Sequence, residues 1–142
     1  MNLIRRILLV DDSTSQSHLI KECLESSKIG KFNVFSCNIN DNVLNLLGSN
    51  NPPLFSLILL EIDSSLDNGL GLLKQIKNEL SPYKIIPVVI FSKIMNLERI
   101  KECFLLGANS FIKKPSKSNY QKILDTITNF WFVHASLPPV LE

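Results

Sequence analysis

Several charged and polar side chains follow the apolar segments of this chain, and together they could hold a cation. They are Asp11, Asp12, Glu61, Asp63, Ser92 and Lys114. Two carboxylates about 4 Å apart repel by about 4 kcal/mol at an effective dielectric constant of about 20. If Asp11, Asp12 and Glu61 lie together, they therefore need a cation or a raised carboxyl pKa. The Lys114 ammonium is one candidate, and Mg²⁺, which prefers oxygen ligands, is the other.

The acidic pair Asp11-Asp12 also has a simpler explanation. An Asp at the end of a strand commonly caps the following helix by accepting its backbone N–H groups. The chain, however, also places a carboxylate, a hydroxyl and a Lys-Pro sequence after three other apolar runs. Such a combination is improbable by chance, so we interpret the set as a functional site.

The segments that must position these residues alternate between apolar runs and helix-period patterns. Apolar runs predict strands at Ile4–Val10, Phe32–Cys37, Phe55–Leu60, Ile85–Phe91 and Ser110–Lys113. Helical spacing predicts helices at Thr14–Lys28, Asn40–Leu47, Gly69–Leu80, Leu97–Leu106 and Ser118–His134. Apolar strands joined by crossover helices indicate a parallel sheet covered on both faces. Right-handed crossovers favour an open, doubly wound α/β fold, whose function is expected outside the carboxyl ends of the strands.

Composition limits the class of protein. The 142 residues are 45% apolar and 20% charged, which is typical of one packed domain. We expect that domain over residues 1–136, with no output domain after it, and a tail over 137–142 in which Leu141-Glu142 is interpreted as the remnant of an expression tag. A net charge of +2 does not argue for nucleic acid, and no apolar run predicts a membrane span. Three widely spaced cysteines without a CxxC pair favour the reducing cytoplasm.

Four stretches of the chain resemble the receiver domain of response regulators. They are ILLVDDS (7–13), LILLE (57–61) with Asn68-Gly69-Leu70 after it, PVVIFS (87–92) and GANSFIKKP (107–115). The resemblance covers roughly residues 4–130 and implies a flavodoxin-like (βα)5 fold with a five-stranded parallel sheet in the order 2-1-3-4-5. The C-terminal NFWF (129–132) with Leu137-Pro138 resembles more narrowly the regulators that partner cyanobacterial phytochromes.

The resemblance implies a phosphoacceptor and a metal site. In this family a sensor histidine kinase passes a phosphoryl group to a carboxylate after the third strand, which is the position of Glu61. Asp11 and Asp12 would hold Mg²⁺ together with residue 61 and the backbone carbonyl of Asp63.

The resemblance also implies three switch residues. Ser92 would bond the phosphoryl group, and Lys114 would pair with the acceptor or with the phosphoryl charge. Phe111 would be the aromatic switch beside Ser92.

The acceptor position departs from the family because it holds Glu61 instead of Asp, in a register fixed by Asn68-Gly69. One extra carbon–carbon bond carries the carboxylate about 1.5 Å farther, where it could contact Lys114 or Ser92. A misplacement of about 1 Å can cost about 10²-fold in rate. We therefore predict that phosphotransfer to residue 61 is absent or very slow. Asp63 is expected to point along its loop, away from Lys114. It is therefore not expected to replace residue 61 as the phosphoacceptor.

Lys93 is a second departure, because the position after Ser92 is usually small in the family. Asp63 and Lys93 would face each other across the mouth of the site. A salt bridge between them, worth about 0–1 kcal/mol, is one hypothesis. Two unrelated solvated charges are the alternative.

The last predicted helix carries four consecutive apolar residues, Phe130 to Val133. Because they cannot all face the core, some aromatic surface should remain for a partner. We expect a homodimer on the side between the fourth strand and the fifth helix. In the alternative, residues 137–140 cover this surface as a lid.

These observations predict a single-domain response regulator of two-component (phosphorelay) signalling that acts through protein contacts and is not an enzyme. It would be a degenerate receiver, or alternatively a phosphorylatable, Mg²⁺-dependent one. Two other classes share parts of the pattern. A flavodoxin-like FMN-binding protein would need a Ser/Thr/Gly-rich phosphate loop where Asp11-Asp12 stands. A haloacid-dehalogenase-type phosphatase would need a second Asp where Ser13 stands.

Overall fold

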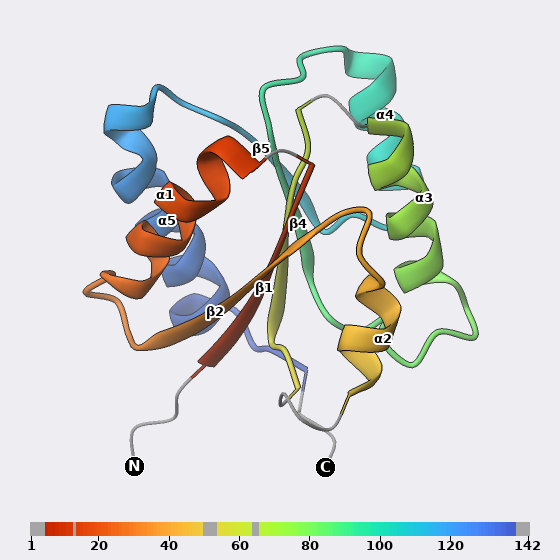
Figure 1. The fold of residues 1–142 in the computed structure, drawn as a ribbon, viewed down its shortest axis with the longest axis horizontal. Helices are drawn as coiled ribbons and strands as arrows, with labels where there is room; N and C mark the ends of the chain where they lie inside the picture. The colour runs from red at the N-terminus through yellow and green to blue at the C-terminus, as the bar shows by residue number, and fades with distance from the viewer. Residues whose placement is uncertain (1–4, 13, 50–53, 64–65, 139–142) are drawn as a thin grey trace.

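The expected alternation of strands and helices is present in the computed structural model, which describes residues 5–12, 14–49, 54–63 and 66–138 (Figure 1). The strands are β1 (Arg5–Asp11), β2 (Phe32–Asn38), β3 (Leu57–Glu61), β4 (Val88–Ser92) and β5 (Ser110–Lys113). The α-helices are α1 (Thr14–Glu25), α2 (Val43–Gly48), α3 (Leu66–Lys77), α4 (Leu97–Leu105) and α5 (Tyr120–Asn129). A 3₁₀ turn, Lys117–Asn119, precedes α5, and a π-helical turn, Phe130–His134, follows it.

The sheet is parallel throughout and has the order β2-β1-β3-β4-β5. This confirms the predicted doubly wound α/β class and the predicted strand order. The order reverses at β1, which is the switch point where such folds place their sites. Register pairs Asp11 of β1 with Glu61 of β3, so both carboxylates lie at the same end of neighbouring strands.

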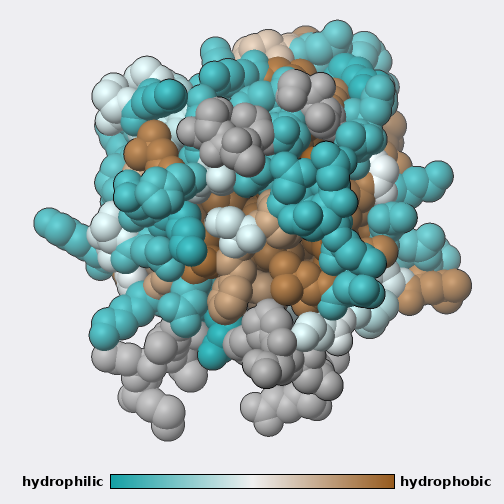
Figure 2. Space-filling model, viewed as in Figure 1, coloured by the Kyte–Doolittle hydropathy of each residue, from teal (hydrophilic) through white to brown (hydrophobic). Residues whose placement is uncertain are grey.

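Helices cover both faces of the sheet, with α1 and α5 on one side and α2, α3 and α4 on the other (Figure 1). Alternation along β1 supplies both layers, because successive side chains of a strand point to opposite faces. Ile7 and Leu9 belong to the core under α1 and α5, and Leu8 and Val10 belong to the core under the other helices. Figure 2 shows a mostly hydrophilic surface in the same view, with apolar side chains visible between the two helical layers.

The ends of some elements differ from the sequence prediction. The fourth strand begins at Val88, because residues 83–86 form a turn in which Ile86 N–H donates to the Tyr83 carbonyl at 3.0 Å. Lys77 stabilises this turn by donating from Nζ to the carbonyls of Lys84 and Ile86, at 2.8 Å each. The last helix was predicted as one element, but it changes to π-helical turns at Phe130.

Close packing explains the glycine at position 69. A Cβ on Gly69 would lie 2.1 Å from Cδ1 of Ile62, a fully buried residue just after β3. Gly69→Ala should therefore lower the free energy of unfolding by about 1–3 kcal/mol, as overpacked cores do. The control is Gly71→Ala in the same helix, where a Cβ meets no atom within 4 Å. That change should raise the free energy by about 0.5–1 kcal/mol. Urea denaturation of both variants measures the difference, and equal effects would contradict this explanation.

Candidate functional site

The carboxyl ends of β1, β3 and β4 and the residue after β5 meet at one edge of the sheet. Glu61 and Ser92 are fully buried there, and Asp11 and Lys114 are 4% exposed. Lys114 reaches this place because its backbone N–H donates to the Ser92 carbonyl at 2.8 Å. The structure thus brings together the acidic and basic residues that the sequence singled out.

The centre of the site is the ammonium group of Lys114. Its Nζ lies 2.5 Å from Glu61 Oε1 and 2.5 Å from Asp63 Oδ2, and donates to Gln16 Oε1 at 3.1 Å. The side chains of Glu61 and Lys114 are both 0% exposed. An ammonium has three protons to donate, and the three oxygens account for all of them.

The position of Asp63 corrects two sequence-based expectations. Its carboxylate points at Lys114 instead of away from it. The hypothesis of an Asp63–Lys93 salt bridge is also wrong: among the described residues Asp63 forms its ion pair with Lys114, and it meets Lys93 only through the backbone N–H, which donates to Asp63 Oδ1 at 2.9 Å. The physical reason is the burial of Lys114, since a buried ammonium needs an acceptor for each proton. Lys93 orients Asp63 through its main chain, and its own side chain is exposed.

Burial and charge shift the pKa values of this cluster. Burial raises the pKa of Glu61, and the carboxylates of Asp63 and Asp11 add to the rise, while Lys114 opposes it. Burial alone would lower the pKa of Lys114, but its bonds to Asp63 and Glu61 raise it. Burial also raises the pKa of Asp11, against a hydrogen bond from Ser17. One ammonium thus faces two carboxylates, and burial disfavours the ionised form of Glu61.

Comparison with known proteins decides the family. The family model of the response regulator receiver domain matches residues 7–127. This chain belongs to the receiver-domain family of response regulators. Two-component response regulators of Oryza sativa are similar to it, one with 38% identity over 109 residues, which is 77% of each chain. Another has 34% identity over 119 residues, which is 81% of this chain, and this chain spans about half the length of that protein (51%).

Solved structures agree with this assignment. The phosphorylated cyanobacterial phytochrome response regulator RcpA is similar with a TM-score of 0.80 and 28% identity, over 96% of this chain and all of that chain (100%). The Mn²⁺-bound form of response regulator Rcp1 is similar with a TM-score of 0.74 and 27% identity, over 95% of this chain and 99% of that one. Because the chain belongs to the receiver-domain family, it is neither a flavodoxin-like FMN-binding protein nor a haloacid-dehalogenase-type phosphatase.

The acidic residues of this receiver do not fit the magnesium site that the family resemblance implies. Within residues 5–12, 14–49, 54–63 and 66–138, no group of three or more His, Cys, Asp or Glu is arranged to hold a metal ion. Glu61 Oε1 and Asp63 Oδ2 face Lys114, and Asp12 Oδ2 accepts the backbone N–H of Asp63 at 2.8 Å. Mg²⁺ demands near-octahedral oxygen ligands, which this arrangement does not offer. We therefore derive no step through a metal.

The side chains of the two other switch residues, Ser92 and Phe111, have their partners outside the Lys114 cluster. The Ser92 hydroxyl accepts the backbone N–H of Ile94 at 3.0 Å. Phe111 is half-buried and packs against the core on the α3 and α4 face. The oxygen of Glu61 that does not face Lys114, Oε2, is buried and has no hydrogen-bond partner among the described residues.

Sequence reasoning missed Gln16 and underestimated Tyr120. Gln16 lies four residues before Ile20, so it occupies the inward face of α1, where a polar side chain is unusual. That position was an available signal. Tyr120 lies in the predicted last helix, Ser118–His134, and was given no polar role, yet its hydroxyl donates to Gln16 Oε1 at 2.6 Å.

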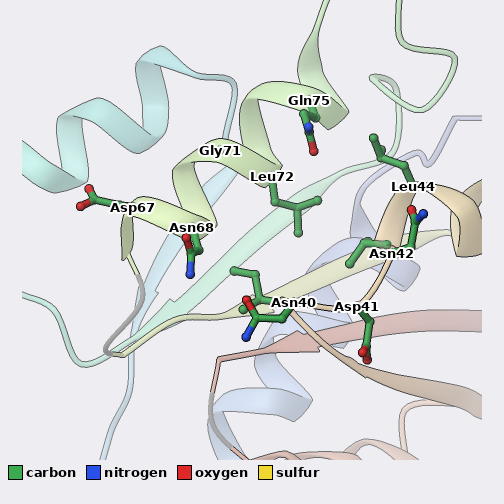
Figure 3. A pocket seen from close by; sticks show the side chains of 11 residues that line it. Asn40, Asp41, Asn42, Leu44, Asp67, Asn68, Gly71, Leu72 and Gln75 are labelled. Carbon is green, nitrogen blue, oxygen red and sulfur yellow. The ribbon is translucent and has the colours of Figure 1, made fainter.

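A separate pocket of about 490 Å³ lies between the segment after β2 and helix α3 (Figure 3). Its polar lining includes Asn40, Asp41, Asn42, Asp67 and Asn68. No residue of the Lys114 cluster lines it. The pocket is therefore distinct from the buried ion pair.

The C-terminal aromatic residues divide as the sequence predicted, into buried and exposed ones. Phe132 packs on Phe32 with ring centroids 4.9 Å apart, and Arg5 lies over its ring. Phe130 and Val133 remain 53% and 57% exposed. Part of the proposed lid, residues 139 and 140, lies outside the described residues. Within the described part of the chain, no helix is long and apolar enough to cross a membrane.

Proposed function

We propose that this chain is a degenerate receiver that signals through protein contacts, with Glu61 held in an ion pair instead of being phosphorylated. The observation that supports the proposal is the 2.5 Å contact between Glu61 Oε1 and Lys114 Nζ, with both side chains 0% exposed. The longer acid engages the lysine that the family resemblance assigns to the acceptor or to the phosphoryl group. Residue 61 is then fixed in one arrangement without a phosphoryl group.

Two physical arguments support this proposal. All three protons of Lys114 are bonded, so none is left for a phosphoryl oxygen. Separating a buried ion pair leaves an uncompensated charge, which costs about 3–5 kcal/mol. A phosphoryl donor would have to meet that cost before Glu61 could attack.

Intact-mass analysis tests the proposal. The protein is incubated with acetyl phosphate and Mg²⁺, and its mass is compared with that of an untreated sample. We expect no gain of a phosphoryl group. Stoichiometric phosphorylation mapped to Glu61 would instead establish the alternative, a phosphorylatable and Mg²⁺-dependent receiver.

We also propose the partners of this receiver. A sensor histidine kinase or another signalling protein is the expected partner, and the chain would carry no enzymatic activity and bind neither nucleic acid nor membrane. Free Cys23, Cys37 and Cys103 fit a reducing compartment, and we propose the cytoplasm.

A homodimer on the side of the molecule between β4 and α5 is part of the same proposal. Three apolar side chains of α4, the helix that follows β4, are exposed: Leu97 (78%), Phe104 (48%) and Leu105 (75%). Exposed apolar patches commonly mark protein interfaces. Light scattering after size-exclusion chromatography should give the mass of two chains, and the mass of one chain would contradict this arrangement.

A further inference from the structure

The buried ion cluster continues beyond Lys114 to polar side chains of α1 and α5. Gln16 is 7% exposed and Tyr120 is 1% exposed. Gln16 Oε1 accepts hydrogen bonds from Lys114 Nζ at 3.1 Å and from the Tyr120 hydroxyl at 2.6 Å. Because an ammonium only donates, the Gln16 atom that faces it must be the carbonyl oxygen. A single oxygen therefore joins the site lysine to the first residue of α5.

This oxygen has a distinct place among the acceptors of Lys114. Glu61 ends β3 and Asp63 lies just after it, so only Gln16 comes from a helix that covers the sheet. The terminal torsion of a glutamine is broad, so the amide needs a second partner to keep its oxygen in one direction. The Tyr120 hydroxyl supplies that partner. The Tyr120 ring is itself fixed by an edge contact with Phe91, with centroids 5.5 Å apart.

We propose that Gln16 and Tyr120 are positioning residues for Lys114: Tyr120 orients the Gln16 amide, and Gln16 holds the ammonium against Glu61 and Asp63. This inference rests on the proposed function, because it explains how the Glu61–Lys114 ion pair is maintained. It also joins the Lys114 cluster to α5, whose continuation exposes Phe130. The position of the Lys114 ammonium then depends on one side chain from α1 and one from α5, as well as on Glu61.

Acylation of lysine amines tests this proposal in the full chain. The protein is treated briefly with acetic anhydride, and the extent of acetylation at each lysine is measured by peptide mass spectrometry. A buried ammonium that is bonded to three oxygens reacts slowly, and loss of one of these bonds increases the rate. Lys77 is the internal control for an intact fold, because its Nζ is held by the carbonyls of Lys84 and Ile86, outside the cluster. Exposed Lys113 gives the reference rate for a free amine.

The ratio of Lys114 to Lys77 acetylation is the informative quantity. Gln16→Met should raise it about tenfold or more, because a hydrogen bond to a charged group is lost. Tyr120→Phe keeps the buried ring and should raise it about threefold to tenfold, since Gln16 loses only its second partner. Tyr83→Phe removes the hydroxyl of a half-buried tyrosine outside the Lys114 cluster. Because Tyr83 lies in the turn that holds Lys77, the ratio of Lys114 to Lys113 acetylation is used for this variant, and it should be unchanged.

Two results would overturn the proposal. One is an unchanged ratio in both Gln16→Met and Tyr120→Phe. The other is an equal rise at Lys77, which would show general loosening of the fold. Glu61→Gln, measured alongside, tests the ion pair separately. If Lys114 becomes reactive in Glu61→Gln alone, the proposed function stands and the positioning role fails. If Glu61→Gln leaves Lys114 unreactive, the ion pair does not hold the lysine and the proposed function fails.

Discussion

Glu61→Asp is expected to be phosphorylated at residue 61 by acetyl phosphate at least about 100-fold faster than the wild type, under the same assay conditions. Shortening the side chain by one methylene withdraws the carboxylate by about 1.5 Å. It then no longer reaches Lys114 Nζ at the 2.5 Å seen for Glu61, and the ammonium has a proton free for an incoming phosphoryl group. Intact-mass analysis over time, with peptide mapping of the modified residue, measures the rates.

Glu61→Gln is the matched control for this prediction. It keeps the length of the side chain and removes the nucleophilic carboxylate, so it should remain unlabelled. Equal labelling of the wild type and Glu61→Asp would show that the extra methylene does not block transfer. An inert Glu61→Asp variant would mean that another feature of the Lys114 cluster prevents phosphotransfer, for example the bonds of Lys114 to Asp63 and Gln16.

The fold could be predicted from the sequence because the apolar runs and the helical spacing match the observed strands and helices along most of the chain. Buried strands such as Ile7–Val10 are continuously apolar, which is typical of central parallel strands. The pairing of Asp11 with Glu61 then follows from strand order and register. The ends of elements were harder to predict. Ile85 and Ile86 continue the apolar run of β4, yet they lie in a turn that Lys77 stabilises from another helix. A local pattern does not contain that distant contact.

The candidate site was only partly predictable for the same reason. Strand ends fixed the positions of Glu61, Ser92 and Lys114. The length of glutamate predicted a contact with Lys114 or Ser92, and the structure shows the contact with Lys114. The direction of Asp63 depends on the backbone of Lys93, which lies on a different loop. Side-chain direction in a loop is set by such contacts, which no sequence period encodes. Electrostatics could have corrected the predicted direction of Asp63, since a buried ammonium needs more than one hydrogen-bond acceptor.

Lys114→Met is expected to lower the free energy of unfolding by about 3–5 kcal/mol, because it removes one partner of a buried ion pair. Glu61 would remain at 0% exposure without its cation, and its Oε2 already lacks a partner among the described residues. For a chain of about this length, such a loss corresponds to a fall in Tm of roughly 10–17 °C. Urea denaturation and thermal melts measure both quantities. The deficit should shrink as the pH falls, because the raised pKa of Glu61 lets it become neutral and a neutral acid needs no cation.

Two further variants separate charge from packing. Lys113→Met changes the exposed neighbouring lysine and should alter stability by no more than about 0.5 kcal/mol. The double variant Lys114→Met, Glu61→Leu replaces both charges by apolar groups and should recover most of the loss, since buried pairs exchanged for apolar residues are often neutral. A double variant as unstable as Lys114→Met would mean that the lysine acts mainly through Asp63 and Gln16. A loss below about 1 kcal/mol in Lys114→Met would contradict a strongly coupled buried pair.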